Sequence, residues 1–157
     1  MVTIRYDDGG DDDGEDGNGD NDDGTIVYQA LSVYFRTTFN VEDISKFTSA
    51  IISADYDDGF IAYINGYEIG RSYNLPEPGT FVPFDTQTFY DHEASLYSGG
   101  LPESILIDSL ELNNILVNGD NVFAVQLHNV STSSSDMSGN FYLTFGRRRK
   151  NTQKQIW

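Results

Sequence analysis

Apolar and polar positions alternate along much of the chain with a period of two, the pattern of β-strands that bury one face. In residues 33–39, for example, Val33, Phe35, Thr37 and Phe39 fall on one face and the intervening side chains on the other. Alternating or continuous apolar runs between turn residues predict strands at 26–28, 33–39, 50–56, 60–64, 67–69, 80–84, 105–112, 122–130 and 141–145. The chain is therefore predicted to be mostly β.

Two short segments between these runs carry strong turn signals. Asp57-Asp58-Gly59 predicts a tight turn, because Asp side chains accept nearby main-chain N–H groups and Gly supplies positive φ. Asn65-Gly66 predicts a type I′ hairpin, in which both central residues need positive φ. These turns indicate antiparallel pairing of neighbouring strands.

Two other segments compete with an all-β interpretation. Residues 41–47 are compatible with a short helix capped by Asn40, with Asp43 three residues further on. Residues 104–116 are ambiguous between helix and strand, and their β-branched residues and β surroundings favour a strand. About eight short strands in one body of this size predict an antiparallel β-sandwich, with a jelly roll as the favoured form.

The 25 acidic and 9 basic residues, which give a formal net charge of −16, are unevenly spread along the chain. Residues 1–24 are dominated by Asp and Gly and offer almost nothing to bury, so they are expected to form an extended, disordered acidic linker. Residues 25–146 form the predicted β-sandwich body, and residues 147–157 a basic polar tail. The body is long enough to bury a single two-layer core.

Composition and charge exclude several classes of partner and fold. An acidic chain is unsuited to nucleic-acid phosphates and to anionic membrane surfaces, and no apolar run is long enough to span a bilayer. The absence of Cys excludes disulfides, a thiol nucleophile and cysteine-ligated metals. No signal peptide is visible, yet an acidic Gly/Asp linker is at home between domains of exported proteins. We therefore expect a piece of a larger extracellular or cell-surface protein.

Four segments together resemble the galactose-binding-domain-like jelly rolls that occur as accessory modules in large bacterial surface and secreted proteins. Residues 56–71 (YDDGFIAYINGYEIGR) resemble the family signature DDG…Y-[LI]-N-G…R, and residues 118–129 (NGDNVFAVQLHN) resemble G-x-N-x-[LFI]-A-V-x-[LV]-H. Residues 34–39 (YFRTTF) and 133–137 (SSSDM) resemble the first strand and the loop before the last strand. The resemblance implies a jelly roll used in carbohydrate binding or surface attachment, with a structural calcium ion in some relatives.

Polar residues on the predicted strands supply candidate ligand-binding groups. Gln126 and His128 project from the same face of one strand, and Tyr63 and Asn65 from one face of another. Sugars are bound by aromatic faces together with planar hydrogen-bonding groups. The candidate ligand-binding residues are therefore Tyr63, Asn65, Arg71, Gln126, His128 and Asn129. Structural roles are the alternative, such as a hydrogen bond from His128 to a main-chain carbonyl or to Asp136.

Calcium prefers oxygen ligands, so Asp57 and Asp58 are the candidate residues for a structural calcium ion in the body. Residues 16–22 of the linker superficially resemble the start of an EF-hand loop. That resemblance fails because Asn21 stands where Gly is needed and Val27 where Glu is needed. The linker is expected to gather calcium only weakly.

An enzyme is not expected, since the chain has no GxSxG, HExxH or P-loop motif. Adjacent carboxylates at Asp57 and Asp58 are a poor arrangement for glycoside hydrolysis, and the spacing of Ser134, His128 and Asp136 gives a triad no support. The sequence predicts a non-catalytic accessory module that binds carbohydrate. The alternative is a structural or adhesive spacer, or a domain that docks neighbouring protein domains without a sugar ligand. Neither nucleic acid nor membrane insertion is expected.

Overall fold

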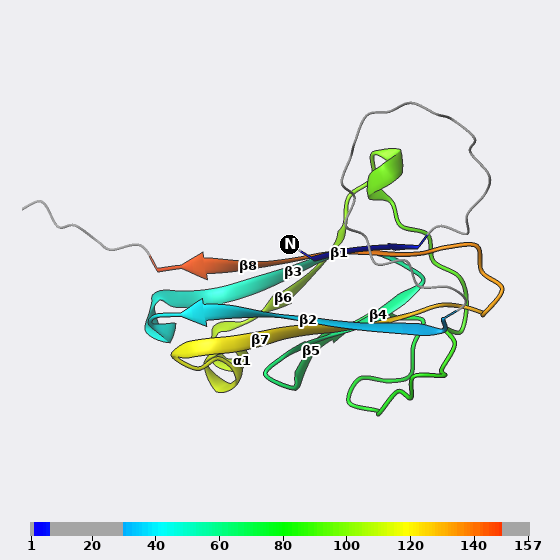
Figure 1. The fold of residues 1–157 in the computed structure, drawn as a ribbon. Helices are drawn as coiled ribbons and strands as arrows, with labels where there is room; N and C mark the ends of the chain where they lie inside the picture. The colour runs from blue at the N-terminus through cyan, green and yellow to red at the C-terminus, as the bar shows by residue number, and fades with distance from the viewer. Residues whose placement is uncertain (1, 7–29, 149–157) are drawn as a thin grey trace, which may run out of the picture.

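Two four-stranded antiparallel sheets stack face to face in the computed structural model, which describes residues 2–6 and 30–148 (Figure 1). One sheet has the strand order β1-β8-β3-β6 and the other the order β2-β7-β4-β5. The strands are β1 (Val2–Tyr6), β2 (Ser32–Val41), β3 (Phe47–Asp57), β4 (Gly59–Ile64), β5 (Tyr67–Arg71), β6 (Glu103–Ile107), β7 (Gly119–His128) and β8 (Met137–Arg147). The predicted antiparallel β-sandwich is confirmed.

The core fills the space between the sheets with side chains from alternate strand positions. Tyr56 and Phe60, on either side of the β3–β4 turn, are fully buried with ring centroids 4.7 Å apart, and Phe60 lies 5.2 Å from Phe141 of β8. These tilted ring pairs are a favourable aromatic arrangement. The predicted inward face of β7 is confirmed by the burial of Phe123, Val125 and Leu127.

The β4–β5 hairpin turns at Asn65 and Gly66, as predicted. Their φ angles of 52° and 84° place both residues in the left-handed region that a type I′ turn requires. The turn aligns Ile64 of β4 with Tyr67 of β5. This alignment carries β5 back along the edge of the second sheet.

The segment 104–116, for which the sequence favours a strand, divides into a strand and a helix. β6 ends before Asp108, whose carboxylate accepts the main-chain N–H groups of Leu110 and Glu111 and so caps α1 (Ser109–Ile115). The helix buries Leu112 and Ile115 against the core. A cap followed by this helical spacing outweighs β propensity, so the strand prediction is wrong for residues 109–115.

The helix predicted at 41–47 is reduced to the 3-10 turn η1 (Ile44–Lys46). Its cap is Asp43, which accepts the N–H of Ser45, rather than Asn40. Asn40 stays in β2, where its side chain donates to the Asp120 carboxylate at the start of the adjacent strand β7.

β5 and β6 are joined by residues 72–102, which contain the 3-10 turn η2 (Leu96–Ser98) and no strand. The strand predicted at 80–84 is therefore wrong. The carbonyls of Thr80, Val82 and Phe84 accept hydrogen bonds from side chains of the second sheet instead of entering a ladder. Pro83 has no N–H to offer a partner strand. These contacts anchor the segment across the outer face of the β2-β7-β4-β5 sheet.

The ends of the folded body differ from the predicted boundaries. Residues 2–6, assigned by sequence to the acidic linker, form β1 and pair with β8. β8 extends to Arg147, one residue beyond the predicted body. Residues 7–29, which include the strand predicted at 26–28, and residues 149–157 lie outside the described residues. Within the described ranges, no helix has the length and apolar character needed to cross a membrane.

Candidate functional site

An open groove lies on the outer face of the β2-β7-β4-β5 sheet, and strand register explains its shape. Arg36 of β2, Ala124 of β7 and Tyr63 of β4 stand in one row across three strands, so the small Ala124 leaves a hollow between two long side chains. Tyr34 and Gln126 pair in a neighbouring row. The groove has a volume of about 390 Å³ and is lined by Tyr34, Phe35, Arg36, Tyr63, Ala124, Val125 and Gln126. We call it the sheet-face groove.

Gln126 holds the two tyrosines of the sheet-face groove in place. Its Nε2 donates to the Tyr34 hydroxyl at 2.7 Å and to the Val82 carbonyl at 2.9 Å, and its Oε1 accepts from the Tyr63 hydroxyl at 3.4 Å. Burial, reinforced by the charge of Glu68, raises the pKa of Tyr63 and keeps its hydroxyl a donor. Tyr63 and Gln126 are thus the two predicted ligand residues that the structure brings together in the groove.

Arg36 is exposed at the side of this groove. Within residues 30–148, no hydrogen bond or ion pair occupies its guanidinium group. None of its five N–H donors is therefore used by a residue of this range.

The guanidinium group of Arg71, in contrast, forms hydrogen bonds within the protein. Nε and Nη2 each lie 2.7 Å from the Glu68 carboxylate, and the group also donates to the carbonyls of Pro76 and Thr80. The side chain of Arg71 is only 4% exposed. The bonds with Glu68 lower the pKa of that carboxyl. The bonds to Pro76 and Thr80 hold the 72–102 connection against β5. Arg71 does not join Tyr63 and Gln126 in the groove.

Asn65 is also committed to internal hydrogen bonds. Its Nδ2 donates to the Ile115 carbonyl and to Oδ1 of Asn121, both at 2.8 Å, and its Oδ1 accepts the Val122 N–H at 2.9 Å. The side chain ties the β4–β5 turn to the end of α1 and the start of β7.

His128 and Asn129 lie where β7 ends, beneath the loops. His128 is fully buried and its Nδ1 lies 2.8 Å from the Thr86 carbonyl, the structural role that the sequence leaves open. Burial lowers its pKa. Neither Ser134 nor Asp136 hydrogen-bonds to its ring, so the three residues do not form a catalytic triad.

The β3–β4 turn brings the two candidate metal ligands to the same end of the sandwich, where they make different contacts. Asp58 accepts the main-chain N–H of His92 at 2.8 Å and that of Val130 at 2.7 Å, one with each carboxylate oxygen. Asp57 is buried, and its carboxylate accepts no hydrogen bond from a described residue. The peptide bond that joins Asp57 and Asp58 is cis.

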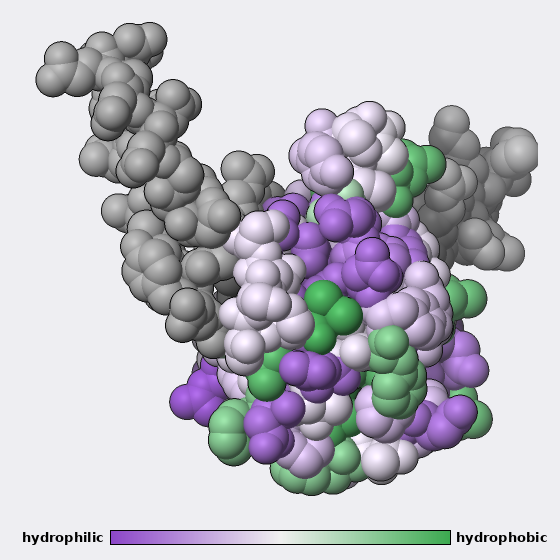
Figure 2. All heavy atoms as spheres, turned by 90° about the vertical axis from the view of Figure 1, so that its right-hand side faces the viewer, coloured by the Kyte–Doolittle hydropathy of each residue, from purple (hydrophilic) through white to green (hydrophobic). Residues whose placement is uncertain are grey.

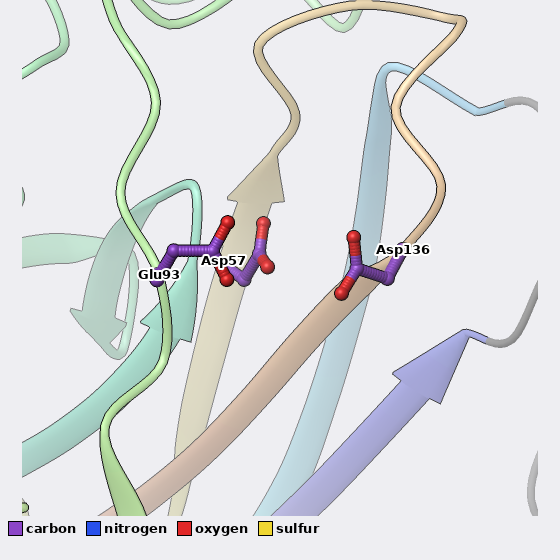
Figure 3. A group of neighbouring side chains, drawn as sticks. All are labelled: Asp57, Glu93 and Asp136. Atoms are coloured by element: carbon purple, nitrogen blue, oxygen red, sulfur yellow. The ribbon is translucent and has the colours of Figure 1, made fainter. Parts of the chain in front are cut away.

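Asp57 faces two further carboxylates, Glu93 of the 72–102 connection and Asp136 at the end of the β7–β8 loop (Figure 3). Carboxylate oxygens of the three residues lie within 4.8 Å of one another, and we call this group the acidic cluster. Burial first, then the charges of Asp58, Asp136, Glu93 and Asp91, raises the pKa of Asp57 to about 8. Figure 2, which looks onto this end of the molecule, shows hydrophilic side chains gathered there.

Sequence reasoning missed four residues of these two regions. Tyr34 and Arg36 alternate with the core residue Phe35, and this alternation was the available signal for an outward-facing pair. Glu93 and Asp136 lie in loops without periodic signal, so only the folded chain places them beside Asp57.

Comparisons with known proteins give little beyond the fold. No protein-family model and no curated protein matches the chain. Among solved structures, the chain is similar to part of the Streptomyces avermitilis α-L-rhamnosidase complexed with L-rhamnose, with a TM-score of 0.47 and 20% sequence identity. The similarity covers 75% of this chain and 9% of the rhamnosidase chain, so this chain spans a small part of that enzyme.

Proposed function

We propose that the chain is a galactose-binding-like jelly-roll module that binds carbohydrate in the sheet-face groove. It acts without catalysis, as an accessory part of a secreted or cell-surface protein. The observation that carries the proposal is the meeting of Tyr34, Tyr63 and the Gln126 amide beside Arg36, whose guanidinium donors no described residue occupies.

The chemistry of these groups suits a sugar. Aromatic rings stack on the apolar C–H patches of a pyranose, and guanidinium N–H groups donate to its hydroxyl oxygens. The hydrogen bonds of Gln126 fix both phenols before a ligand arrives, which reduces the conformational entropy lost on binding. The volume of about 390 Å³ lies within the range of small-molecule sites and suits a short segment of a glycan.

The same residues argue against hydrolysis of the bound sugar. Glycoside hydrolysis requires two carboxyl groups on either side of the scissile bond. The residues that line the groove include neither Asp nor Glu. The groove is therefore suited to holding a glycan rather than cleaving it.

The test is a glycan-array screen of the intact chain, followed by affinity measurements with any glycan that binds. Tyr34→Ala and Arg36→Ala should each weaken binding by about tenfold, which corresponds to ~1.4 kcal/mol. Tyr67→Ala is the matched control, because Tyr67 is as exposed as Tyr34 (59% and 57%) but lies outside the groove. Thermal unfolding of each variant confirms that it is folded.

Two results would overturn the proposal. If the folded chain binds no glycan on a broad array, the module is a spacer or a protein-docking domain. If a glycan binds but Tyr34→Ala and Arg36→Ala retain the affinity of the parent, the groove is not the binding site.

A further inference from the structure

Arg36, at the side of the sheet-face groove, differs from the other basic residues of the sandwich. From β2 to β7 the basic residues are Arg36, Lys46 and Arg71, among a larger number of acidic ones. Lys46 lies 3.4 Å from the Glu42 carboxylate, and Arg71 lies 2.7 Å from that of Glu68. The charges of Lys46 and Arg71 are thus compensated by carboxylates, whereas no described carboxylate compensates that of Arg36.

The surroundings of Arg36 on the outer face of the sheet are uncharged. Its neighbours along β2 that point the same way are Tyr34 and Thr38, and its partner on β7 is Ala124. The residues that line the groove include neither Asp nor Glu. The described walls of the groove therefore present a cation and no anion that competes for it.

Glu68 is the carboxylate that lies opposite the groove residue Tyr63 in the pairing of β4 and β5. Its two oxygens accept from Nε and Nη2 of Arg71, both at 2.7 Å, and one of them also accepts the N–H of Gly79 at 3.0 Å. These bonds use the charge of Glu68 inside the fold. Glu68 therefore does not neutralise Arg36, which stands on the far side of the groove.

The hydrogen bonds of Gln126 determine how the Tyr34 hydroxyl can act. The Val82 carbonyl can only accept, so the amide atom of Gln126 that lies 2.9 Å from it must be the donor Nε2. The same Nε2 donates to the Tyr34 oxygen at 2.7 Å, so the hydroxyl accepts in this contact and keeps its own proton to donate. No described residue accepts that proton. The Tyr34 hydroxyl thus adds a neutral donor to the charged donors of Arg36.

A group of donors that includes a cation matches a carboxylate, which offers acceptor oxygens and a negative charge. A guanidinium group binds a carboxylate through two parallel N–H···O bonds, which are shorter and stronger than bonds between neutral groups. A neutral sugar hydroxyl can accept one of these N–H groups, but it leaves the charge of Arg36 uncompensated. Among sugars, uronic acids carry the carboxylate that this arrangement suits.

We propose that the sheet-face groove selects glycans that contain uronic-acid residues. The guanidinium group of Arg36 and the hydroxyl of Tyr34 bind the carboxylate, and the ring of Tyr63 contacts the apolar side of the sugar. This inference rests on the proposed binding of carbohydrate in the groove, to which it adds the class of sugar.

The formal net charge of −16 opposes the approach of an anionic sugar at long range. At physiological ionic strength, charges separated by more than about 8 Å are largely screened from each other. Contact with Arg36 therefore dominates once the sugar lies in the groove. For this reason the affinities are to be measured at about 0.15 M salt rather than in dilute buffer.

The test is a calorimetric titration of the intact chain with oligosaccharides of galacturonic acid and of glucuronic acid, each as the free acid and as the methyl ester. The ester keeps the sugar and removes the charge. The acid form should bind about 10- to 100-fold more tightly, as expected for a charge-assisted hydrogen bond. Arg36→Gln should bring this ratio close to one. Tyr34→Phe, which keeps the ring and removes the hydroxyl donor, should lower the ratio by a smaller factor.

Lys46→Gln is the matched control, because it changes the net charge as Arg36→Gln does but lies outside the groove. It should keep the ratio of the parent, which separates direct contact from a general effect of charge. Arg36 is exposed, so its replacement should leave the protein folded, and thermal unfolding of each variant checks this.

The possible failures of the inference and of the proposed function are distinct. If neutral glycans or the methyl esters bind as tightly as the acids, the selection for uronic acids is overturned and the proposed carbohydrate binding stands. The selection is also overturned if Arg36→Gln keeps the ratio of the parent. If the folded chain binds no glycan, acidic or neutral, the proposed function and this inference both fail.

Discussion

Asp58 accepts the main-chain N–H of Val130 at 2.7 Å and so joins the β3–β4 turn to the loop that follows β7. Its other carboxylate oxygen accepts the N–H of His92. One side chain therefore holds two loops to the turn, and the polar atoms at this end of the sandwich depend on it for their positions. Its neighbour Asp57 has a different environment, because no N–H from a described residue compensates its buried carboxylate.

Asp58→Ala should destabilise the protein by about 1–3 kcal/mol, because it leaves two main-chain donors without their acceptor. Burial raises the pKa of Asp58, and the hydrogen bonds from the N–H groups of His92 and Val130 oppose that effect because they stabilise the charged carboxylate. Urea unfolding of the parent and the variant in a chelator measures the difference. A variant as stable as the parent would show that water replaces Asp58 at both donors.

Asp57→Asn should have the opposite effect on stability. Burial and the charges of Asp58, Asp136, Glu93 and Asp91 raise the pKa of Asp57 to about 8, so folding near neutral pH requires this carboxyl to take up a proton, a cost that a neutral amide of similar size avoids. We expect the variant to be more stable than the parent by about 1–3 kcal/mol in a chelator near neutral pH. Urea unfolding curves of the parent and the variant measure the difference, and a variant less stable than the parent would contradict the expectation.

The sequence is sufficient to predict the fold where the period of a strand or the chemistry of a turn determines the local structure. The sequence correctly predicts Phe123, Val125 and Leu127 in the core, because a strand places alternate residues on one face. Asn65-Gly66 predicts a hairpin because few other residue pairs adopt two consecutive positive φ angles. Both inferences depend on local geometry, which needs no knowledge of the rest of the fold.

Both candidate sites depend on relationships that the sequence does not contain. The sheet-face groove exists because Tyr34 pairs with Gln126, and a register shift of one residue would move the Tyr34 side chain to the other face. Glu93 reaches Asp57 only because the 72–102 connection is fixed by contacts such as that of His92 with Asp58. Arg71 was a reasonable ligand by residue type, but its pairing with Glu68 commits it to the fold.

Glu68→Gln should destabilise the protein by about 1.5–3 kcal/mol near pH 7, because the almost buried Arg71 loses its charged partner. The pKa of Glu68 in the folded state lies below the ordinary value of 4.5, chiefly because of its hydrogen bonds with Arg71. Its stabilisation is therefore complete above about pH 4.5 and is lost as the pH falls through the folded-state pKa.

The difference in unfolding free energy between the parent and Glu68→Gln should consequently stay constant above about pH 4.5 and shrink as the pH falls below it. Denaturant unfolding on both sides of this pH measures it. Glu42→Gln is the control, since Glu42 is 85% exposed in its ion pair with Lys46 and should change stability little at any pH. A difference that stays constant with pH would mean that the charge of Glu68 contributes nothing to the pair.

Two substitutions of Asn65 can separate the contribution of its side chain to stability from the contribution of its backbone conformation. Asn65→Gly keeps a residue that adopts positive φ but removes the hydrogen bonds to Ile115, Asn121 and Val122. Asn65→Ala removes the same bonds and adds strain at a φ of 52°. We expect Asn65→Gly to lose about 1–3 kcal/mol and Asn65→Ala to lose about 1 kcal/mol more. Thermal and urea unfolding give both values. If the Gly variant were as stable as the parent, the side-chain bonds would be dispensable and the turn would depend on backbone conformation alone.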